Sequence, residues 1–182
     1  MKELSLNILD VAKNSVVAGA SLVEISLNTD ERGWLTLRIC DNGCGMNEET
    51  LKHVTDPFYT TRTTRKVGLG LPLLKLAAEQ TGGTLRIESS VEVGKSGTSL
   101  EATFDTTNID CMPIGDVIST VCILIAGSPD IDFDFFDRSP KHSVSLKTRE
   151  LRAVLGEEIS LAEPEVQMWI KEYLQEQYAS ET

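Results

Sequence analysis

Asp41-Asn42-Gly43-Cys44-Gly45-Met46 is the most informative segment of this 182-residue chain. It directly follows residues 35–39, where Leu35, Leu37 and Ile39 alternate with polar residues in the pattern of a half-buried strand. The glycines permit a tight turn after that strand. The segment therefore predicts that the Asp41 carboxylate lies at the floor of a pocket as a hydrogen-bond acceptor. A plain turn residue is the alternative, because Asp-Asn-Gly is also a common turn sequence.

A second motif, Asp10-x-x-x-Asn14, lies in a helical pattern near the N-terminus. Residues four apart on a helix project together. The Asn14 amide oxygen is thus a candidate ligand of Mg²⁺, which needs few protein ligands, and Asp10 is a candidate to orient a water or hydroxyl. Together with Glu3 and Asn7 these two residues form one polar stripe, which we expect to face water, a metal or a polar ligand. The alternative is that Asp10 and Asn14 simply line solvent.

Two glycine motifs complete the set, Gly68-Leu69-Gly70-Leu71 and Gly97-Thr98. The first opens a helical pattern, and free backbone N–H groups at a helix N-terminus suit phosphate oxygens. Arg62, Arg65 and Lys66 lie just upstream, and we expect one of these cations, with Lys66 as the candidate, to contact the phosphates. A solvated basic loop is the alternative.

No single motif is specific, but the four in this order predict a pocket for ATP and Mg²⁺. A carboxylate at the pocket floor can accept a hydrogen bond from the amino group of adenine. Guanine presents a carbonyl oxygen at the same ring position, and two facing acceptors would leave each other unpaired. The chemistry of Asp41 therefore favours adenine over guanine.

Composition and charge exclude several other classes of protein. The chain has 28 acidic and 17 basic residues, a net charge of −11, which argues against a nucleic-acid partner. The longest apolar stretch, 117–126, is too short to cross a bilayer, and the N-terminus shows no signal segment, so we expect a soluble cytoplasmic protein. The four cysteines lack the spacing of a zinc site and are expected to be reduced.

Periodicity predicts helices laid on one mixed or antiparallel sheet. A helical pattern covers 4–18, and two strand pairs with turn-rich links follow at 23–39 and 84–104, with a helix over 71–81 between them. The character changes after Asp105. We therefore predict an ATP-binding domain at 1–105 and a small α+β extension of unknown role at 106–182.

The last helix of that extension, starting after Ser160, has an apolar face that we expect to pack on its own chain. The face comprises Val166, Trp169, Ile170, Tyr173 and Leu174. The extension shows no recognisable chemistry, and whether the chain forms a homodimer stays open.

The four motifs resemble those of the histidine-kinase-like ATPase superfamily, which joins gyrase, the Hsp90 chaperone, mismatch-repair ATPases and sensor kinases. The resemblance covers about the first 105 residues and implies a two-layer α/β sandwich of the Bergerat ATP-binding type. It also implies Asn14 as the magnesium ligand, Asp41 as the adenine contact, Gly43 and Gly45 as turn glycines, and Thr98 at the base edge. Residues 56–61 are similar to the phenylalanine box of sensor kinases, and the loop that follows, through Val67, is similar to their ATP lid.

Two departures from that superfamily shape the expected function. Asp10 stands where the family often has Glu, and its side chain is one methylene shorter. The phosphoacceptor helix pair of sensor kinases is missing, so the chain resembles standalone ATP-binding proteins. We expect a kinase or ATPase that transfers the terminal phosphoryl group of ATP to a partner protein in signalling. The alternative is an ATP-gated switch that regulates a partner without turnover.

Overall fold

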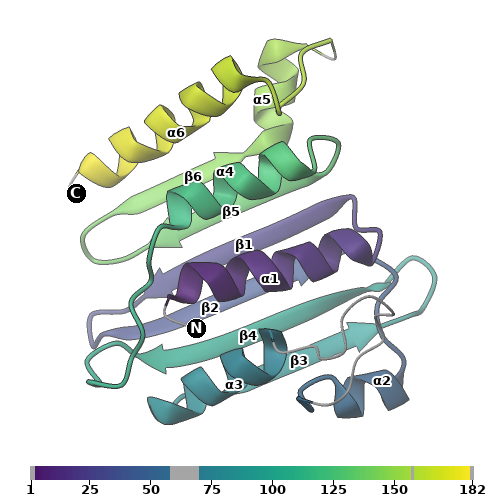
Figure 1. Ribbon diagram of the computed structural model, residues 1–182, viewed down its shortest axis with the longest axis vertical. Coiled ribbons are helices and arrows are strands. Elements are labelled where there is room, and N and C mark those ends of the chain that lie inside the picture. Colours follow the sequence, from purple (N-terminus) through teal and green to yellow (C-terminus); the bar gives the residue numbers. More distant parts are fainter. Residues whose placement is uncertain (1–2, 58–69, 157, 181–182) are drawn as a thin grey trace.

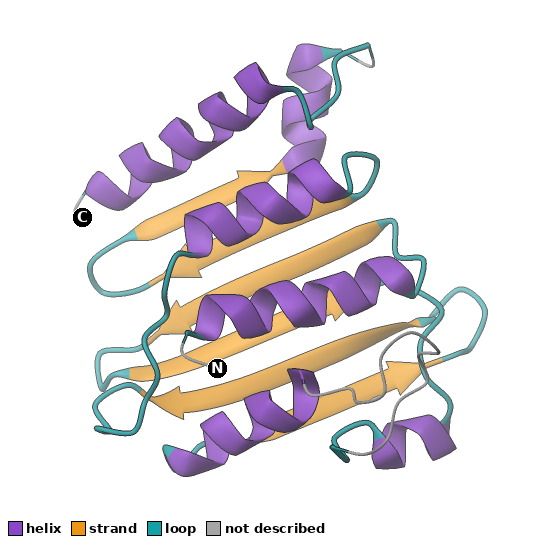
Figure 2. Cartoon of the chain, viewed as in Figure 1, coloured by secondary structure: helices purple, strands orange, loops and turns teal. Residues whose placement is uncertain are grey.

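The computed structural model describes residues 3–57, 70–156 and 158–180, and within them one six-stranded sheet carries most of its helices on one face (Figures 1 and 2). The strands are β1 (Leu22–Thr29), β2 (Trp34–Asp41), β3 (Leu85–Ser90), β4 (Gly97–Asp105), β5 (Asp132–Arg138) and β6 (Ser143–Lys147). The helices are α1 (Leu4–Val17), α2 (Glu48–His53), α3 (Gly70–Gln80), α4 (Val117–Gly127), α5 (Thr148–Leu155) and α6 (Pro164–Ala179). This arrangement confirms the predicted two-layer α+β architecture.

The strand order is β3-β4-β2-β1-β5-β6, and the sheet is mixed. Every neighbouring pair is antiparallel except β1 and β5, which are parallel. A parallel neighbour requires a crossover, and the chain makes it through α4, which lies on the same face as α1 and α3 (Figure 1). The strands after residue 105 thus continue the first sheet. A division into domains at 105 stays a prediction.

The core lies between the sheet and its helices and follows the predicted alternation. On β1 and β2 the buried residues are Val23, Ile25, Leu27, Leu35, Leu37 and Ile39. Leu4, Ile8 and Val11 of α1 are buried as well, and all belong to one apolar cluster. Burial of each such side chain contributes about 1.5 to 3 kcal/mol before conformational entropy is counted. This packing fixes α1 above the strands that carry the candidate site.

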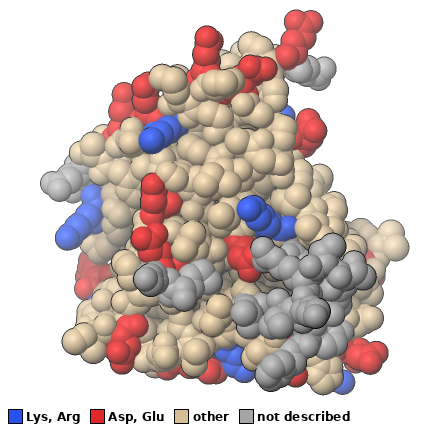
Figure 3. Space-filling view, viewed as in Figure 1, with Lys and Arg blue, Asp and Glu red and all other residues tan. Residues whose placement is uncertain are grey.

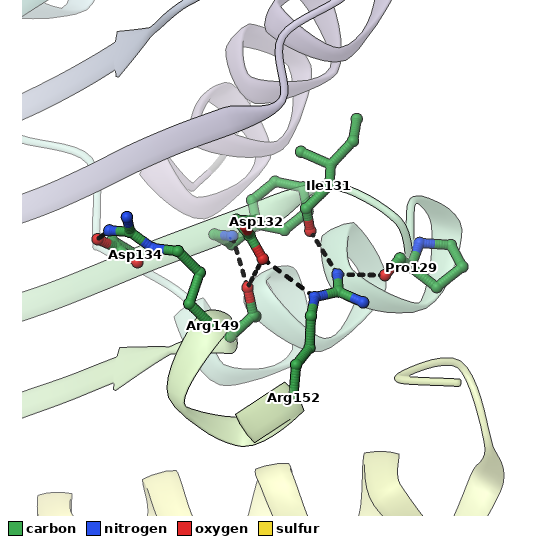
Figure 4. A network of polar contacts seen from close by, with 8 residues as sticks. Pro129, Ile131, Asp132, Asp134, Arg149 and Arg152 are labelled. Atoms are coloured by element: carbon green, nitrogen blue, oxygen red, sulfur yellow. Dashed lines mark hydrogen bonds and ion pairs between the residues drawn. The ribbon is translucent and has the colours of Figure 1, made fainter. Parts of the chain in front are cut away.

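Polar contacts attach the C-terminal helices to the sheet. Arg149 of α5 bonds Asp134 at 2.7 Å, and Arg152 bonds Asp132 at 3.0 Å and also donates to the carbonyl groups of Pro129 and Ile131 (Figure 4). The Gln177 side chain of α6 accepts from the backbone N–H of Ser145 and donates to its carbonyl, so it pairs with the free edge of β6.

The apolar face of α6 is buried only in part. Val166, Ile170 and Leu174 are buried as predicted. Trp169 and Tyr173 stack on each other 4.9 Å apart but remain exposed, so the prediction was wrong for these two residues. Trp169 and Tyr173 directly precede the buried residues Ile170 and Leu174, so their side chains are rotated away from the buried face and lie at its edge.

Within the described residues, no helix combines the length and hydropathy that a membrane crossing requires.

Candidate functional site

The carboxylate of Asp41, at the end of β2, is held from two directions. Its Oδ2 accepts a hydrogen bond of 2.6 Å from the Ser15 hydroxyl on α1, and its Oδ1 accepts one of 2.9 Å from the backbone N–H of Gly43. Asp41 is half-buried, whereas Ser15 is 4% exposed. A carboxylate offers about four lone-pair positions, so Asp41 keeps the capacity to accept from a ligand.

The turn after Asp41 is closed by side-chain and backbone bonds. The Asn42 Oδ1 accepts from the backbone N–H groups of Ser21 and Leu22 at 2.9 and 3.0 Å, which ties the turn to the start of β1. Gly45 has φ +70°, and a Cβ on it would lie 1.9 Å from the carbonyl oxygen of Ser90. Only glycine fits there, because both the backbone angle and the space exclude a side chain.

Thr98 on β4 lies beside Asp41. The two are paired in the register of β2 and β4. The Thr98 and Ser89 hydroxyls are 2.8 Å apart, and Ser89 Oγ also accepts from the backbone N–H of Met46 at 2.8 Å. A Cβ on Gly97 would lie 2.1 Å from the Asp41 carbonyl oxygen, so glycine lets β4 approach the end of β2. The structure thus joins two motifs that are far apart in the sequence.

Asp10 on α1 meets the start of α3. A Cβ on Gly70 would lie 2.0 Å from Asp10 Oδ2, so the carboxylate packs directly against the first residue of that helix. Gly70 is buried and Leu71 is half-buried. Asn14 follows one turn after Asp10 and is half-buried. The structure therefore brings Asp10 to the first residue of α3, with Asn14 one turn further along α1. The N-terminus of a helix favours negative charge.

Three predicted phosphate contacts, Lys66, Gly68 and Leu69, lie outside the described residues, and so do residues 58–67 of the lid predicted over 55–67. Asn7 departs from the expectation for the polar stripe. It is completely buried, and neither its amide nitrogen nor its oxygen has a hydrogen-bond partner among the described residues. Asn7 is thus enclosed in the core, whereas Glu3, Asp10 and Asn14 of the stripe are half-buried.

Two residues that support the site were not among the predicted ones: Ser15 and Ser89. Ser15 directly follows Asn14, so its adjacency to a candidate ligand was the available signal. Ser89 lies on the edge strand β3, and the pairing of β3 with β4 brings its hydroxyl to that of Thr98. No local pattern could have revealed that contact, since it depends on the register between two strands.

Acidic side chains are scattered over the helix-bearing face, which is the face shown in Figure 3. The described residues contain no cluster of three or more His, Cys, Asp or Glu side chains suited to a metal ion. A magnesium ion bound mainly through one amide oxygen, waters and phosphates needs no such cluster. The half-buried Asn14 amide beside the Asp10 carboxylate is a donor set of that kind.

Comparisons with known proteins agree with this geometry. Residues 1–108 match the profile of a family described as histidine kinase-, DNA gyrase B-, and HSP90-like ATPase. Over 90 residues the chain is 38% identical to sporulation kinase D of Bacillus subtilis, a match covering 48% of this chain and 17% of that protein. Over 70 residues it is 40% identical to sensor protein RprX of Bacteroides fragilis, covering 36% and 14%. The chain thus spans a small fraction of these relatives.

Among solved structures, the Aquifex aeolicus MutL ATPase domain complexed with ADP superposes with a TM-score of 0.56. The match covers 85% of this chain and 69% of that one at 16% sequence identity. At this identity the likeness concerns the fold alone. It confirms the predicted Bergerat architecture.

Proposed function

The chain belongs to the histidine kinase-, DNA gyrase B- and HSP90-like ATPase family and so binds ATP, and from this premise we propose that it is a Mg²⁺-dependent phosphotransferase or ATPase. In this proposal it transfers the terminal phosphoryl group of ATP to a partner protein in signalling. The observation that carries the proposal is the contact between the Asp10 carboxylate and Gly70. This contact supports the proposal, because a carboxylate is able to accept a proton and a helix N-terminus suits phosphate oxygens.

Asp41 recognises the base in this proposal. Its two oxygens already accept bonds from Ser15 and Gly43, which fix the carboxylate, and a remaining lone pair accepts from the amino group of adenine. Thr98, paired with Asp41 across β2 and β4, contacts the base edge. Gly43 and Gly45 shape the turn that lets the base approach.

Mg²⁺ and the phosphates are bound at the other end of the site. Asn14 would hold the ion through its amide oxygen, and the ion would neutralise phosphate charge. The backbone N–H groups at the start of α3, around Gly68, Leu69, Gly70 and Leu71, bind phosphate oxygens, with Lys66 as an added cation. Positioning and charge neutralisation supply most of the catalysis in such phosphoryl transfers.

Asp10 accepts the proton of the attacking group. In the transfer step the bond from the terminal phosphorus to the bridging oxygen of ATP breaks, and a bond to the acceptor oxygen or nitrogen forms. ADP departs with the electron pair, and the acceptor's proton passes to Asp10. In this proposal the acceptor is a His, Ser or Thr of a separate protein.

Incubation of the purified protein with γ-labelled ATP, Mg²⁺ and cell lysate tests this function. We expect a labelled partner or released phosphate, with the signal lost in Asp10→Asn. Absence of both products, or equal activity in Asp10→Asn, would overturn the proposal.

A second candidate function is an ATP-gated switch without turnover, favoured by the short side chain of Asp10. The Asp10 side chain is one methylene shorter than that of Glu, so it reaches less far, and its carboxylate lies against Gly70. In this function ATP changes how residues 106–182 meet a partner. Partner capture with and without ATP distinguishes the two, since a switch requires nucleotide-dependent affinity. We also propose a cytoplasmic location. Sedimentation of the purified protein tests whether the chain forms a homodimer.

A further inference from the structure

The face of the sheet opposite α1, α3 and α4 carries a hollow of about 610 Å³. Its floor consists of short side chains, Ser26 and Asn28 on β1 and Thr36 on β2. Longer side chains border it on both sides, Arg38 on β2 and, on β5, Phe136 and Arg138. The depression thus follows from residue size, with short side chains on β1 and at Thr36 between the longer ones of Arg38, Phe136 and Arg138.

The register places these residues on one face. Ser26 is paired with Arg38 on one side and Phe136 on the other. Asn28 is paired in the same way with Thr36 and Arg138. Alternate residues of a strand share a face, so the six form two adjacent rows across three strands. Leu27, between Ser26 and Asn28 on β1, also lines the hollow, but it is 1% exposed and belongs to the apolar core.

The hollow carries positive charge that its own side chains do not compensate. Arg38 Nε donates to Glu101 Oε2 at 2.6 Å. Glu101 is the one carboxylate among the residues that line the hollow, so this carboxylate is already paired with Arg38. Arg138 is exposed and, within the described residues, has neither an ion pair nor a side-chain hydrogen bond. In a chain with a net charge of −11 such a local excess of positive charge is notable. A guanidinium binds carboxylate and phosphate groups through two parallel hydrogen bonds.

Phe136 adds an apolar surface beside the two arginines. Its ring is half-buried, and Lys147 Nζ lies 5.8 Å from the ring centroid. The α5 helix covers this face of β5 only at the start of the strand, where Arg149 binds Asp134 and Arg152 binds Asp132 (Figure 4). A volume of this size is within the usual range for small-molecule sites.

We propose that this hollow binds a small organic anion with a flat ring, whose phosphate or carboxylate contacts Arg138 and Arg38 and whose ring contacts Phe136. The site is separate from the nucleotide site. Asp41 has the parity of the buried residues Leu37 and Ile39 on β2, whereas Arg38 projects from the opposite face. The proposal does not depend on ATP turnover.

Titration of ¹⁵N-labelled full-length protein with phenyl phosphate, without nucleotide, tests the site by NMR. We expect saturable shifts of backbone amides at 26–28, 36–38 and 136–138. Arg138→Ala should weaken binding about tenfold, since it removes a charge-assisted pair of bonds. Phe136→Leu should weaken phenyl phosphate binding severalfold while leaving inorganic phosphate binding unchanged.

Two controls make the result specific. Lys75→Ala removes one positive charge from α3, on the opposite face of the sheet, and should leave the affinity unchanged. Asp41→Asn should also leave it unchanged, which separates this site from the nucleotide pocket. Absence of saturable shifts in the three segments, or equal affinity in Arg138→Ala and wild type, would overturn the proposal.

Discussion

Asp41 and Ser15 share a hydrogen bond of 2.6 Å that joins the end of β2 to the buried side of α1. Ser15 is adjacent to Asn14, so the bond sets the distance between the proposed base contact and the proposed magnesium ligand. Because Ser15 is almost completely buried, this link is protected from competing water. The bond therefore connects the proposed base contact, Asp41, to the part of α1 that carries the proposed magnesium ligand, Asn14.

Asp41→Asn should weaken ATP binding by about 10- to 100-fold. The substitution keeps the shape of the side chain but removes its charge and one acceptor, and a hydrogen bond to a charged group contributes about 1.5 to 3 kcal/mol. Calorimetric titration with ATP and GTP measures the change. We also expect the preference for ATP over GTP to diminish.

Ser15→Ala is the matched control, because it leaves both carboxylate oxygens of Asp41 in place. We expect a smaller loss of ATP affinity and a loss of stability of about 1 kcal/mol. Unchanged ATP affinity in an Asp41→Asn protein with wild-type melting behaviour would show that Asp41 does not contact the base.

Asp10→Asn should separate chemistry from binding. Loss of a general base lowers turnover by about 10²- to 10⁴-fold. ATP affinity should stay the same or increase, because the substitution removes a negative charge beside Gly70, where phosphates are proposed to bind. Phosphate release and calorimetric titration measure the two effects. A parallel fall in affinity and turnover would instead indicate a binding role for Asp10.

Gly45→Ala should destabilise the protein much more than Gly94→Ala. Both glycines have positive φ, +70° and +84°, so each substitution incurs a backbone cost of about 1 to 2 kcal/mol. A Cβ on Gly45 would also overlap the Ser90 carbonyl, whereas nothing lies within 4 Å of one on Gly94. We expect an added loss of at least about 2 kcal/mol for Gly45, measured by urea unfolding. Equal losses would contradict the close approach of the turn to β3.

Tyr178→Phe should change how stability depends on pH. Burial, and then the charge of Asp137, raise the pKa of the Tyr178 phenol above its ordinary value. Its hydroxyl donates to Asp137 at 2.7 Å, and Asp137 is 4% exposed. A raised pKa in the folded state gives stability that is complete below the unfolded pKa, about 10, and is lost as pH rises above it. Tyr178→Phe should therefore be less stable near neutral pH and lose less above pH about 10.

Urea unfolding between neutral and strongly alkaline pH measures this effect. Tyr173→Phe is the control, because Tyr173 is exposed on the same helix and should leave the pH dependence unchanged. The same alkaline loss of stability in Tyr178→Phe and wild type would exclude the Tyr178–Asp137 bond as its cause.

Local patterns were enough to predict the elements and the architecture. Neighbouring residues alone predict the strand at 35–39, the glycine turn after Asp41 and the polar stripe of α1. These periodicities of 2 and 3.6 residues indicate which side of an element is buried. They do not indicate what lies against it, which is why Asn7 and the aromatic pair Trp169 and Tyr173 departed from expectation.

Contacts between distant segments came from the three-dimensional arrangement. The bond from Ser15 to Asp41, the approach of Gly70 to Asp10 and the parallel pairing of β5 with β1 all join parts of the chain that share no sequence pattern. The hollow beside Arg138 has the same origin, since it needs three strands in one register. Residue types fix local conformation and burial, whereas register and helix placement follow from packing the whole chain into a single core.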